Sequence, residues 1–318
     1  MRIAILDDYQ HLSTRLADWS AVQARAEVVI FDRHLSEQEA VSALADFDAV
    51  CHLRERMAMP RSLIDRLPRL KCIFITGHEH RTLDLAACRE RGIVVSYALN
   101  GPTGLSATPE LSWGLILSLA RQIPEAAAAM KQGGWQRHCG TVLRGKTLGL
   151  LGLGRIGKAM VPVAQAFGMQ VLAWSRNLQP EPARAAGAEY ATLDDLLARS
   201  DYVSLHLVLG ERTRHVLGAR ELGLMKPTAY LVNTSRAALV EPAALMDTLV
   251  NRRIAGAALD VFEVEPLPDD DALRKLDNVI LTPHLGYTVQ ESLRDFYRGT
   301  VENVSAWLAG QPVNVVGG

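Results

Sequence analysis

The chain has 318 residues, a length typical of two domains that each bury a core of their own. Its 34 Lys and Arg residues nearly balance 35 Asp and Glu residues, giving a net charge of −1, and 48% of its residues are apolar. This composition excludes a disordered chain and a broadly basic nucleic-acid binder. The apolar run before Asp7 is too short for a secretory signal, and the run 111–120 is too short to span a bilayer. We therefore expect a cytoplasmic protein without a membrane span.

The first hundred residues alternate short β-branched or aliphatic runs with amphipathic stretches. Such alternation is typical of βα units that build a parallel sheet. Ser36 and Glu39 form a capping-box pattern that predicts a helix over residues 36–45, and Pro60 suits the first turn of a helix ending near Leu67. The predicted strands are residues 2–6, 28–31, 49–52, 71–75 and 93–96.

A second series of predicted strands follows Gly133, and its runs are apolar enough to be buried on both faces of a sheet. Between the two series, residues 108–121 suit a helix, because Pro109 and Glu110 favour its first turn. Another amphipathic helix is predicted over residues 290–308. The second series consists of strands 148–151, 170–173, 202–205, 229–233, 255–259 and 279–281, with helices that include 155–167, 193–198 and 241–250.

The cysteines and one histidine-rich stretch predict no metal site. Cys51, Cys72, Cys88 and Cys139 contain no C-x-x-C pair, so we interpret them as reduced thiols that take no part in chemistry. The stretch His78-Glu79-His80 lacks the i, i+4 spacing that places two imidazoles on one helical face. It is interpreted as a polar loop.

A glycine motif predicts a dinucleotide site. Gly152-Leu153-Gly154-Arg155-Ile156-Gly157 directly follows a predicted strand and opens a predicted helix, the context in which G-x-G-x-x-G indicates dinucleotide binding. The first glycine allows the tight turn, the second lets backbone approach a pyrophosphate, and the third lets helix and strand pack closely. The phosphates would then lie at the positive end of the helix.

The end of the next predicted strand indicates which dinucleotide is bound. An acid at this point normally accepts hydrogen bonds from the ribose hydroxyls of NAD. Here the chain has Ser175 and Arg176, and the first carboxylate, Glu181, follows only after Pro180. A hydroxyl and a guanidinium suit the 2′-phosphate of NADP, so we expect NADP in preference to NAD. The alternative is that Arg176 is a solvated loop residue and the protein accepts either cofactor.

Polar residues follow three strands of the second series. Arg236 follows one strand, Glu265 follows the next, and His284 follows the third. Each could singly be a surface residue, but an open parallel sheet places its ligand crevice at these strand ends. Their occurrence together predicts an active site.

These motifs closely resemble those of the D-isomer-specific 2-hydroxyacid dehydrogenases, which include glyoxylate/hydroxypyruvate reductases and phosphoglycerate dehydrogenases. The resemblance covers nearly the whole chain and implies an α/β fold of two doubly wound parallel-sheet domains. The implied domains are a flavodoxin-like substrate domain, residues 1–100 and 285–318, and a Rossmann NAD(P)-binding domain, residues 101–284. Besides the glycine motif, the resemblance rests on Thr76-Gly77 with Leu83-Asp84-Leu85, on 107–111, on 233–236, on Asp260-Val261-Phe262, on Glu265-Pro266 and on Thr282-Pro283-His284.

The resemblance implies that Arg236, Glu265 and His284 are the catalytic residues. Arg236 would bind the carboxylate of a 2-oxoacid and polarise its carbonyl while a hydride arrives from the nicotinamide. His284 would donate the proton, and Glu265 would fix the imidazole and favour its charged form. Further implied contacts are Thr108, Arg155, Ile156, Thr234 and Asp260 with the cofactor, the last to the nicotinamide amide, and Arg54, Thr76 and Gly77 with the substrate.

The expected protein is an NAD(P)-dependent reductase of a small anionic 2-oxoacid such as glyoxylate or hydroxypyruvate, without a nucleic-acid or membrane partner. We also expect a homodimer formed through the helix 108–121 and the arm 123–135. One alternative is a phosphoglycerate dehydrogenase-like enzyme, and another is a non-catalytic dinucleotide sensor or corepressor. The intact set Arg236, Glu265 and His284 counts against the sensor. Ala237, Val208 and Val289 depart from residues common in the family, but none replaces a catalytic residue.

Overall fold

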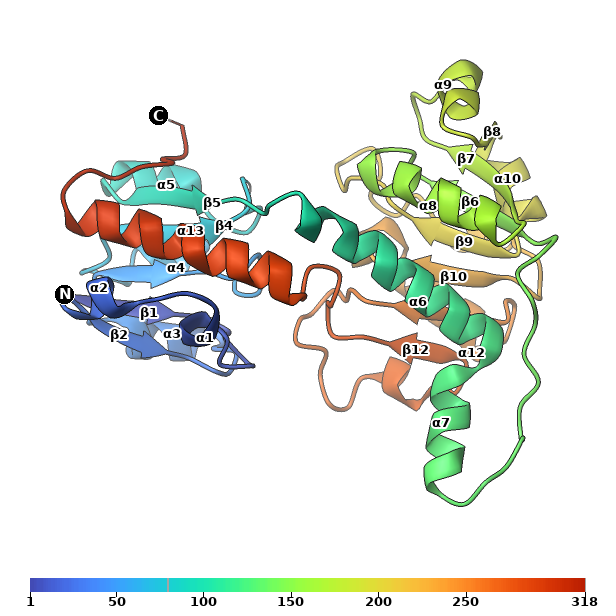
Figure 1. Cartoon of the computed structure of the whole chain (residues 1–318), viewed down its shortest axis with the longest axis horizontal. Helices are drawn as coiled ribbons and strands as arrows, with labels where there is room; N and C mark the ends of the chain where they lie inside the picture. Colours follow the sequence, from blue (N-terminus) through green and yellow to red (C-terminus); the bar gives the residue numbers. More distant parts are fainter. Residues whose placement is uncertain (79, 318) are drawn as a thin grey trace. The chain divides into compact units, whose positions relative to one another are not determined.

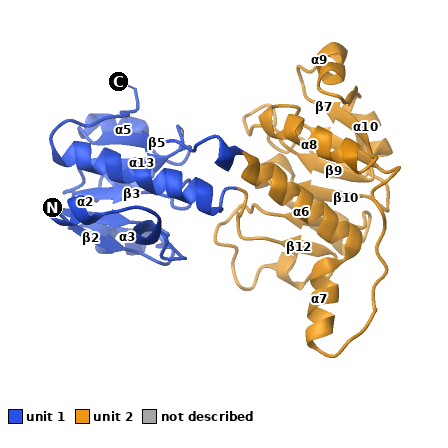
Figure 2. Ribbon diagram, in the orientation of Figure 1, with its two compact units in different colours: residues 1–105, 287–318 blue, residues 106–286 orange. Residues whose placement is uncertain are grey.

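A computed structural model of the chain describes residues 1–78 and 80–317. It contains two compact units, each with its own core (Figure 2). Unit 1 comprises Met1–Leu105 and Tyr287–Gly318, and unit 2 comprises Ser106–Gly286. Over the described part of the chain, no helix combines the length and apolar character needed to cross a membrane.

Unit 1 is built on a sheet of five parallel strands, β1 (Arg2–Ile5), β2 (Glu27–Ile30), β3 (Ala49–Cys51), β4 (Cys72–Thr76) and β5 (Val94–Ala98). Their order, β2-β1-β3-β4-β5, is the flavodoxin-like order. The chain first adds β2 on one side of β1 and then crosses to add β3 on the other side. This switch point between β1 and β3 is where doubly wound sheets bind ligands. The predicted strands are confirmed, with ends displaced by at most two residues.

The helices of unit 1 include one from the C-terminal part of the chain. In that helix, Leu293, Phe296 and Val304 are buried in a core shared with Ile3 and Phe74, so the last thirty residues complete the fold of the first hundred (Figure 1). The helices are α1 (Ser13–Leu16), α2 (Ser20–Gln23), α3 (Glu37–Leu44), α4 (Arg61–Ile64), α5 (Leu85–Glu90) and α13 (Gln290–Leu308), and a 3-10 helix, η1 (Thr103–Ser106), precedes unit 2.

The capping box predicted at Ser36 is confirmed. The Glu39 N–H donates to Ser36 Oγ (3.3 Å), and the Ser36 N–H donates to Glu39 Oε2 (2.9 Å). The prediction for Pro60 was wrong in its position. Pro60 is the N-cap residue of α4, and α4 already ends at Ile64, because two turn hydrogen bonds, including Leu67 N–H to the Ile64 carbonyl, replace further α-helix.

Unit 2 is built on a sheet of seven parallel strands, β6 (Thr147–Leu151), β7 (Gln170–Trp174), β8 (Glu189–Tyr190), β9 (Tyr202–Leu205), β10 (Tyr230–Asn233), β11 (Gly256–Leu259) and β12 (Val279–Leu281). The order β12-β11-β10-β9-β6-β7-β8 is the dinucleotide-binding order with one further strand at the edge. Six strands were predicted and are confirmed, whereas β8 was missed because it is two residues long and exposed. The predicted class of two doubly wound α/β domains is thus confirmed.

The helices of unit 2 pack on its sheet, and α6 and α8 lie side by side over β6 and β10 (Figure 1). Helix α6 buries Trp113, Ile116 and Leu119 there. The helices are α6 (Ala107–Arg121), α7 (Ile123–Lys131), α8 (Arg155–Ala166), α9 (Pro180–Ala185), α10 (Leu193–Arg199), α11 (Ala219–Leu222) and α12 (Pro242–Val250), with 3-10 helices η2 (Ala237–Leu239) and η3 (Ala272–Lys275).

The cysteines and the histidine-rich stretch lie in different surroundings. All four cysteines are free thiols, and only Cys139 is exposed. In the stretch interpreted as a polar loop, Glu79 lies outside the described residues, but His80 is 7% exposed and its ring meets that of His52 edge to face at 5.0 Å. Burial lowers the pKa of both imidazoles. This part of the chain is a loop, as predicted, and His80 is a buried neutral side chain within it.

Candidate active site

The glycine motif forms the turn between β6 and α8. Gly152 has a φ of 106°, which L side chains rarely adopt, and a Cβ there would stand 2.6 Å from the His206 carbonyl oxygen. A Cβ at Gly157 would overlap the Gly152 carbonyl oxygen, whereas a Cβ at Gly154 would meet nothing within 4 Å. Gly152 and Gly157 are therefore needed by the fold itself, and Gly154 faces open space.

The amino end of α8 fits the phosphates of a dinucleotide. Arg155, Ile156 and Gly157 begin this 12-residue helix, and no acidic residue stands in its first turn. The first backbone N–H groups of a helix have no partner within it, and the helix dipole makes this end positive. Together with the open space at Gly154, this end of α8 could hold a pyrophosphate.

Ser175 and Arg176 directly follow β7, the strand next to β6. Arg176 is exposed, and its Nε donates to the Arg212 carbonyl oxygen at 2.7 Å. The next acid along the chain, Glu181, lies in the first turn of α9. The edge of the sheet beside the glycine turn thus carries a guanidinium where NAD-binding sheets carry an acid.

Arg236, Glu265 and His284 follow the adjacent strands β10, β11 and β12 of unit 2. His284 Nδ1 lies 2.6 Å from Glu265 Oε2, and Glu265 Oε1 accepts the Phe262 N–H at 2.8 Å. Burial raises the pKa of Glu265, but the hydrogen bond and charge of His284, with a contribution from Arg236, hold it below its usual value. The structure thus brings the three predicted catalytic side chains to one edge of one sheet.

The loop that carries His284 is fixed by Asp260. His284 has a left-handed backbone, with a φ of 53°, and Asp260 is 0% exposed. Asp260 Oδ1 accepts Thr282 Oγ1 (2.6 Å) and the Leu285 N–H (2.7 Å), and Oδ2 accepts the Gly286 N–H (2.9 Å). Burial raises the pKa of Asp260, and these hydrogen bonds oppose that rise. One carboxylate therefore holds the chain both before and after His284.

Thr108 and Thr234, predicted to contact the cofactor, are linked through a residue that sequence reasoning missed. Ser112 Oγ donates to the Thr108 carbonyl oxygen at 2.9 Å and lies 2.8 Å from Thr234 Oγ1. Thr108 Oγ1 in turn donates to the Gly286 carbonyl oxygen at 2.7 Å. Ser112 could have been noticed as a polar residue one helical turn after Thr108 in an apolar segment.

The backbone around Arg236 is held by Asn233, a second residue whose role the sequence did not indicate. Asn233 Nδ2 donates to the Arg236 carbonyl oxygen (3.0 Å), and its Oδ1 accepts the Ser235 N–H (3.0 Å). Ser235 Oγ donates to the Leu207 carbonyl oxygen at 2.7 Å, which ties this turn to the chain after β9. The direction in which Arg236 leaves the sheet is thus set by its own strand end.

The residues predicted to contact substrate from the first part of the chain lie together in unit 1. The Arg54 N–H donates to Thr76 Oγ1 (2.6 Å), and Arg54 Nη1 donates to the Thr76 carbonyl oxygen (3.1 Å). Gly77 has a φ of 93°, and a Cβ there would overlap the Arg54 guanidinium. The glycine therefore leaves the space that the arginine occupies.

The family model "D-isomer specific 2-hydroxyacid dehydrogenase, NAD binding domain" matches residues 113–286. The chain belongs to this family. Because the matched domain is the NAD-binding one, the predicted nicotinamide dinucleotide is supported as the cofactor class, and the resemblance noted in the sequence is confirmed.

Relatives and a solved structure agree with this assignment. The chain is 40% identical over 267 residues to a glyoxylate reductase of Thermococcus litoralis, covering 80% of each chain. It is 36% identical over 277 residues to a hydroxypyruvate reductase of Thermotoga maritima, covering 85% of this chain and 88% of that one. A crystal structure of a putative D-3-phosphoglycerate dehydrogenase oxidoreductase from Ralstonia solanacearum superposes with a TM-score of 0.91 at 38% identity, covering 99% of this chain and 96% of that one.

The different surroundings of Gly154 and Gly157 give a matched pair of substitutions. Gly157→Ala should lower the free energy of unfolding by about 2 kcal/mol, because its methyl group would overlap the Gly152 carbonyl oxygen. Gly154→Ala should leave stability nearly unchanged and weaken dinucleotide binding, because its methyl group enters the open space before α8. Urea unfolding and fluorescence titration with NADPH and NADH measure the two effects. Equal behaviour of the two variants would contradict the assignment of this turn.

Proposed function

We propose that this chain reduces a small 2-oxoacid of the glyoxylate or hydroxypyruvate type, using a nicotinamide dinucleotide. The observation that carries the proposal is the 2.6 Å hydrogen bond between His284 and Glu265, on strand ends next to that of Arg236. The same sheet carries the glycine turn at β6. The named relatives, a glyoxylate reductase and a hydroxypyruvate reductase, support the substrate class.

The residues of unit 2 can perform the proton chemistry of this reduction. When bound, the reduced nicotinamide supplies the hydride that the carbonyl carbon receives. Arg236 binds the substrate carboxylate through its planar fork and polarises the carbonyl oxygen, on which negative charge develops. His284 donates a proton to that oxygen from Nε2, because its Nδ1 is bonded to Glu265. Glu265 keeps the ring in this orientation and stabilises the positive charge of the imidazolium.

Cofactor contacts by Thr108, Arg155, Ile156 and Thr234 belong to this proposal, with unit 2 as the dinucleotide-binding domain and unit 1 as the substrate-binding domain. Asp260 serves the reaction by holding the loop of His284. The predicted contact of Asp260 with the nicotinamide amide also belongs to this proposal. A phosphoglycerate dehydrogenase-like reaction is the second candidate, because the solved structure from Ralstonia solanacearum carries that description.

We also propose a homodimer formed through α6 and the arm 123–135. None of the nine residues of α7 is buried in its own unit. Ile123, Met130 and Trp135 are 50%, 54% and 73% exposed, a set of large apolar side chains that a second copy would cover.

The proposed reaction is tested by an assay with NADPH and NADH over glyoxylate, hydroxypyruvate, pyruvate, phenylpyruvate and phosphohydroxypyruvate. His284→Ala and Arg236→Ala should each lower turnover by about a hundredfold or more, through loss of the proton donor or of the cation facing the oxyanion. His215→Asn is the control, since it replaces an exposed imidazole of unit 2 by a residue that tolerates its positive φ. Near wild-type turnover in both alanine variants would refute the mechanism.

The preference for NADP, which we infer from Ser175 and Arg176, has its own test. Changing Ser175 to Asp and Arg176 to Ser should shift the ratio of kcat/KM for NADPH over NADH by about tenfold or more toward NADH, through loss of a charged hydrogen bond to the 2′-phosphate. Arg184→Ser removes another exposed arginine, in α9, and should leave the ratio unchanged. An unaltered ratio in the double variant would remove the argument for NADP.

A further inference from the structure

Two histidines of unit 1 lie in contact inside the fold, on the loops that follow two neighbouring strands. His52 comes directly after β3, and His80 lies on the loop after β4. Their rings meet edge to face, with centres 5.0 Å apart, and the two residues are 3% and 7% exposed. We refer to them as the imidazole pair, because they join the two loops within the protein.

Most ring nitrogens of the imidazole pair lack a protein partner. Within residues 1–78 and 80–317, no group forms a hydrogen bond with either nitrogen of His52 or with Nε2 of His80. The fourth nitrogen, Nδ1 of His80, lies 3.3 Å from Thr82 Oγ1. Buried polar groups of folded proteins nearly always have partners, because an unpaired group has lost its hydrogen bonds to water. The pair thus lowers stability relative to two apolar side chains at the same place.

Protonation is incompatible with this contact. An imidazolium has two N–H donors that need acceptors, and two protonated rings would place like charges side by side in a buried position. Burial lowers the pKa of both rings, and His80 lowers that of His52 further. Two charged groups face His80, of which Glu55 raises its pKa and Arg54 lowers it. The buried pair is therefore neutral, and it takes up protons only when it opens to water.

The same two loops carry the residues of unit 1 that the sequence predicted to contact substrate. Arg54 lies two residues after His52, and Gly77 lies three residues before His80. The loops meet there as well, because a Cβ at Gly77 would overlap the Arg54 guanidinium. Separation of the loops at the imidazole pair would therefore displace the residues on the substrate side.

Backbone hydrogen bonds report whether the two loops are joined. The Met59 N–H donates to the Thr82 carbonyl oxygen at 2.9 Å, and the Asp84 N–H donates to the Met59 carbonyl oxygen at 3.0 Å. The Leu83 N–H donates to the His80 carbonyl oxygen at 3.1 Å. Exchange of these amide hydrogens with solvent measures how often this part of the fold opens.

We propose that His52 and His80 form an acid-sensitive latch, which holds the two loops together at neutral pH and releases them when the rings are protonated. In the open state each ring has the ordinary histidine pKa of about 6.5. Because only the open state binds these protons, the closed state is fully favoured above that pH and loses stability as the pH falls below it. The latch stands on the contact between the rings, whereas its effect on substrate binding rests on the proposed function.

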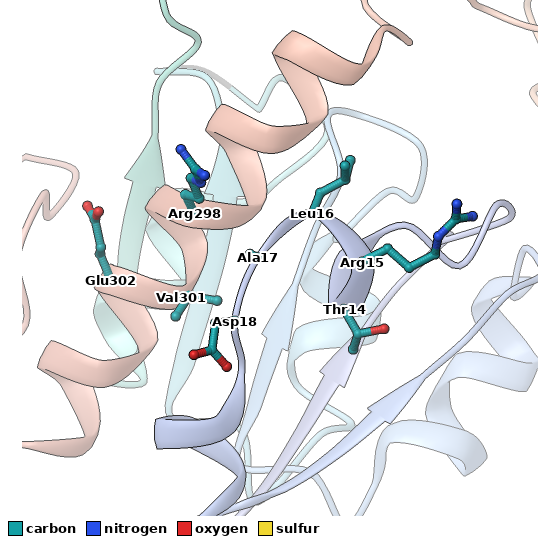
Figure 3. Close-up of a pocket in the computed structure, with 8 residues that line it drawn as sticks. All are labelled: Thr14, Arg15, Leu16, Ala17, Asp18, Arg298, Val301 and Glu302. Carbon is teal, nitrogen blue, oxygen red and sulfur yellow. The ribbon is translucent and has the colours of Figure 1, made fainter.

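Another part of unit 1 supplies an internal control. Eight residues line a hollow between α1 and α13, and none of these eight is a histidine (Figure 3). The charged residues among them are arginines and acids, types that titrate far from neutral pH. Val301 lies at this hollow, within the 19-residue helix α13. Exchange of its amide hydrogen should therefore not follow the latch.

The experiment measures amide hydrogen exchange of the full chain by NMR at about pH 7.5 and about pH 5.5, a range in which exposed acids stay ionised. Protection is corrected for the intrinsic pH dependence of exchange. At Leu83 and Asp84 it should fall by about tenfold for each imidazole that opening exposes. Protection at Val301 should stay unchanged, and the fall at the loop should reverse when neutral pH is restored.

A double variant, His52→Met with His80→Met, removes both titrating groups and leaves apolar side chains in their place. Protection of Leu83 and Asp84 should then no longer depend on pH. His11→Asn is the control, since it removes an exposed imidazole of unit 1 at a positive φ that Asn tolerates. This control should keep the full pH dependence.

The effect on substrate binding is measured as the KM for glyoxylate at the same two pH values. On acidification the KM of the wild type should rise about twofold or more relative to that of the double variant, the rise expected once half of the molecules are open. The comparison cancels the titration of His284, which both proteins retain. An unchanged ratio of the two KM values would overturn the effect on substrate.

Three results would overturn the latch. One is protection of Leu83 and Asp84 in the wild type that does not fall on acidification, and this result decides even if the double variant does not fold. Another is an equal fall at Val301, which would indicate loosening of the whole unit. The third is a double variant that keeps the pH dependence. If the wild type reduces no 2-oxoacid, the proposed function fails, whereas hydrogen exchange still decides the latch.

Discussion

The hydrogen bond between His284 Nδ1 and Glu265 Oε2 is the interaction on which the site in unit 2 depends. It requires β11 and β12 to be parallel neighbours, so that both side chains emerge at one edge. The loop that carries His284 is held by Asp260, which is 0% exposed, and a buried carboxylate is costly unless its oxygens are bonded. The three hydrogen bonds from Thr282, Leu285 and Gly286 offset this desolvation cost and fix the left-handed backbone of His284.

The two sheets could be predicted from the sequence because strands of a parallel sheet are covered on both faces and form short continuous apolar runs. Strand β8 could not be predicted in this way, because Glu189 and Tyr190 are exposed at the sheet edge and form no apolar run. The catalytic residues of the candidate site could be predicted from their types and from their positions at strand ends. The bonds of Asp260 to the loop of His284, and the link of Thr108 to Thr234 through Ser112, join segments far apart in the chain. Only the fold reveals such pairs.

Charge in this protein is balanced overall but uneven locally. The net charge of −1 excludes broad polyanion binding. Yet in unit 1 the guanidiniums of Arg54 and Arg56 lie near the ring of Tyr287. In unit 2, Arg236 follows strand β10, which is next to β11, the strand that Glu265 follows. Local positive charge of this kind recognises small anions by geometry, because the planar guanidinium matches the oxygens of a carboxylate or phosphate.

In the proposed mechanism Glu265 acts through His284, and the rate of cofactor oxidation in a single turnover of Glu265→Gln measures this most directly. Gln can still accept a hydrogen bond from the imidazole, but it lacks the charge that stabilises the imidazolium. We predict a rate about tenfold or more below that of the wild type, with unchanged dinucleotide affinity. A wild-type rate in this variant, or a rate lowered only through weaker dinucleotide binding, would contradict the account.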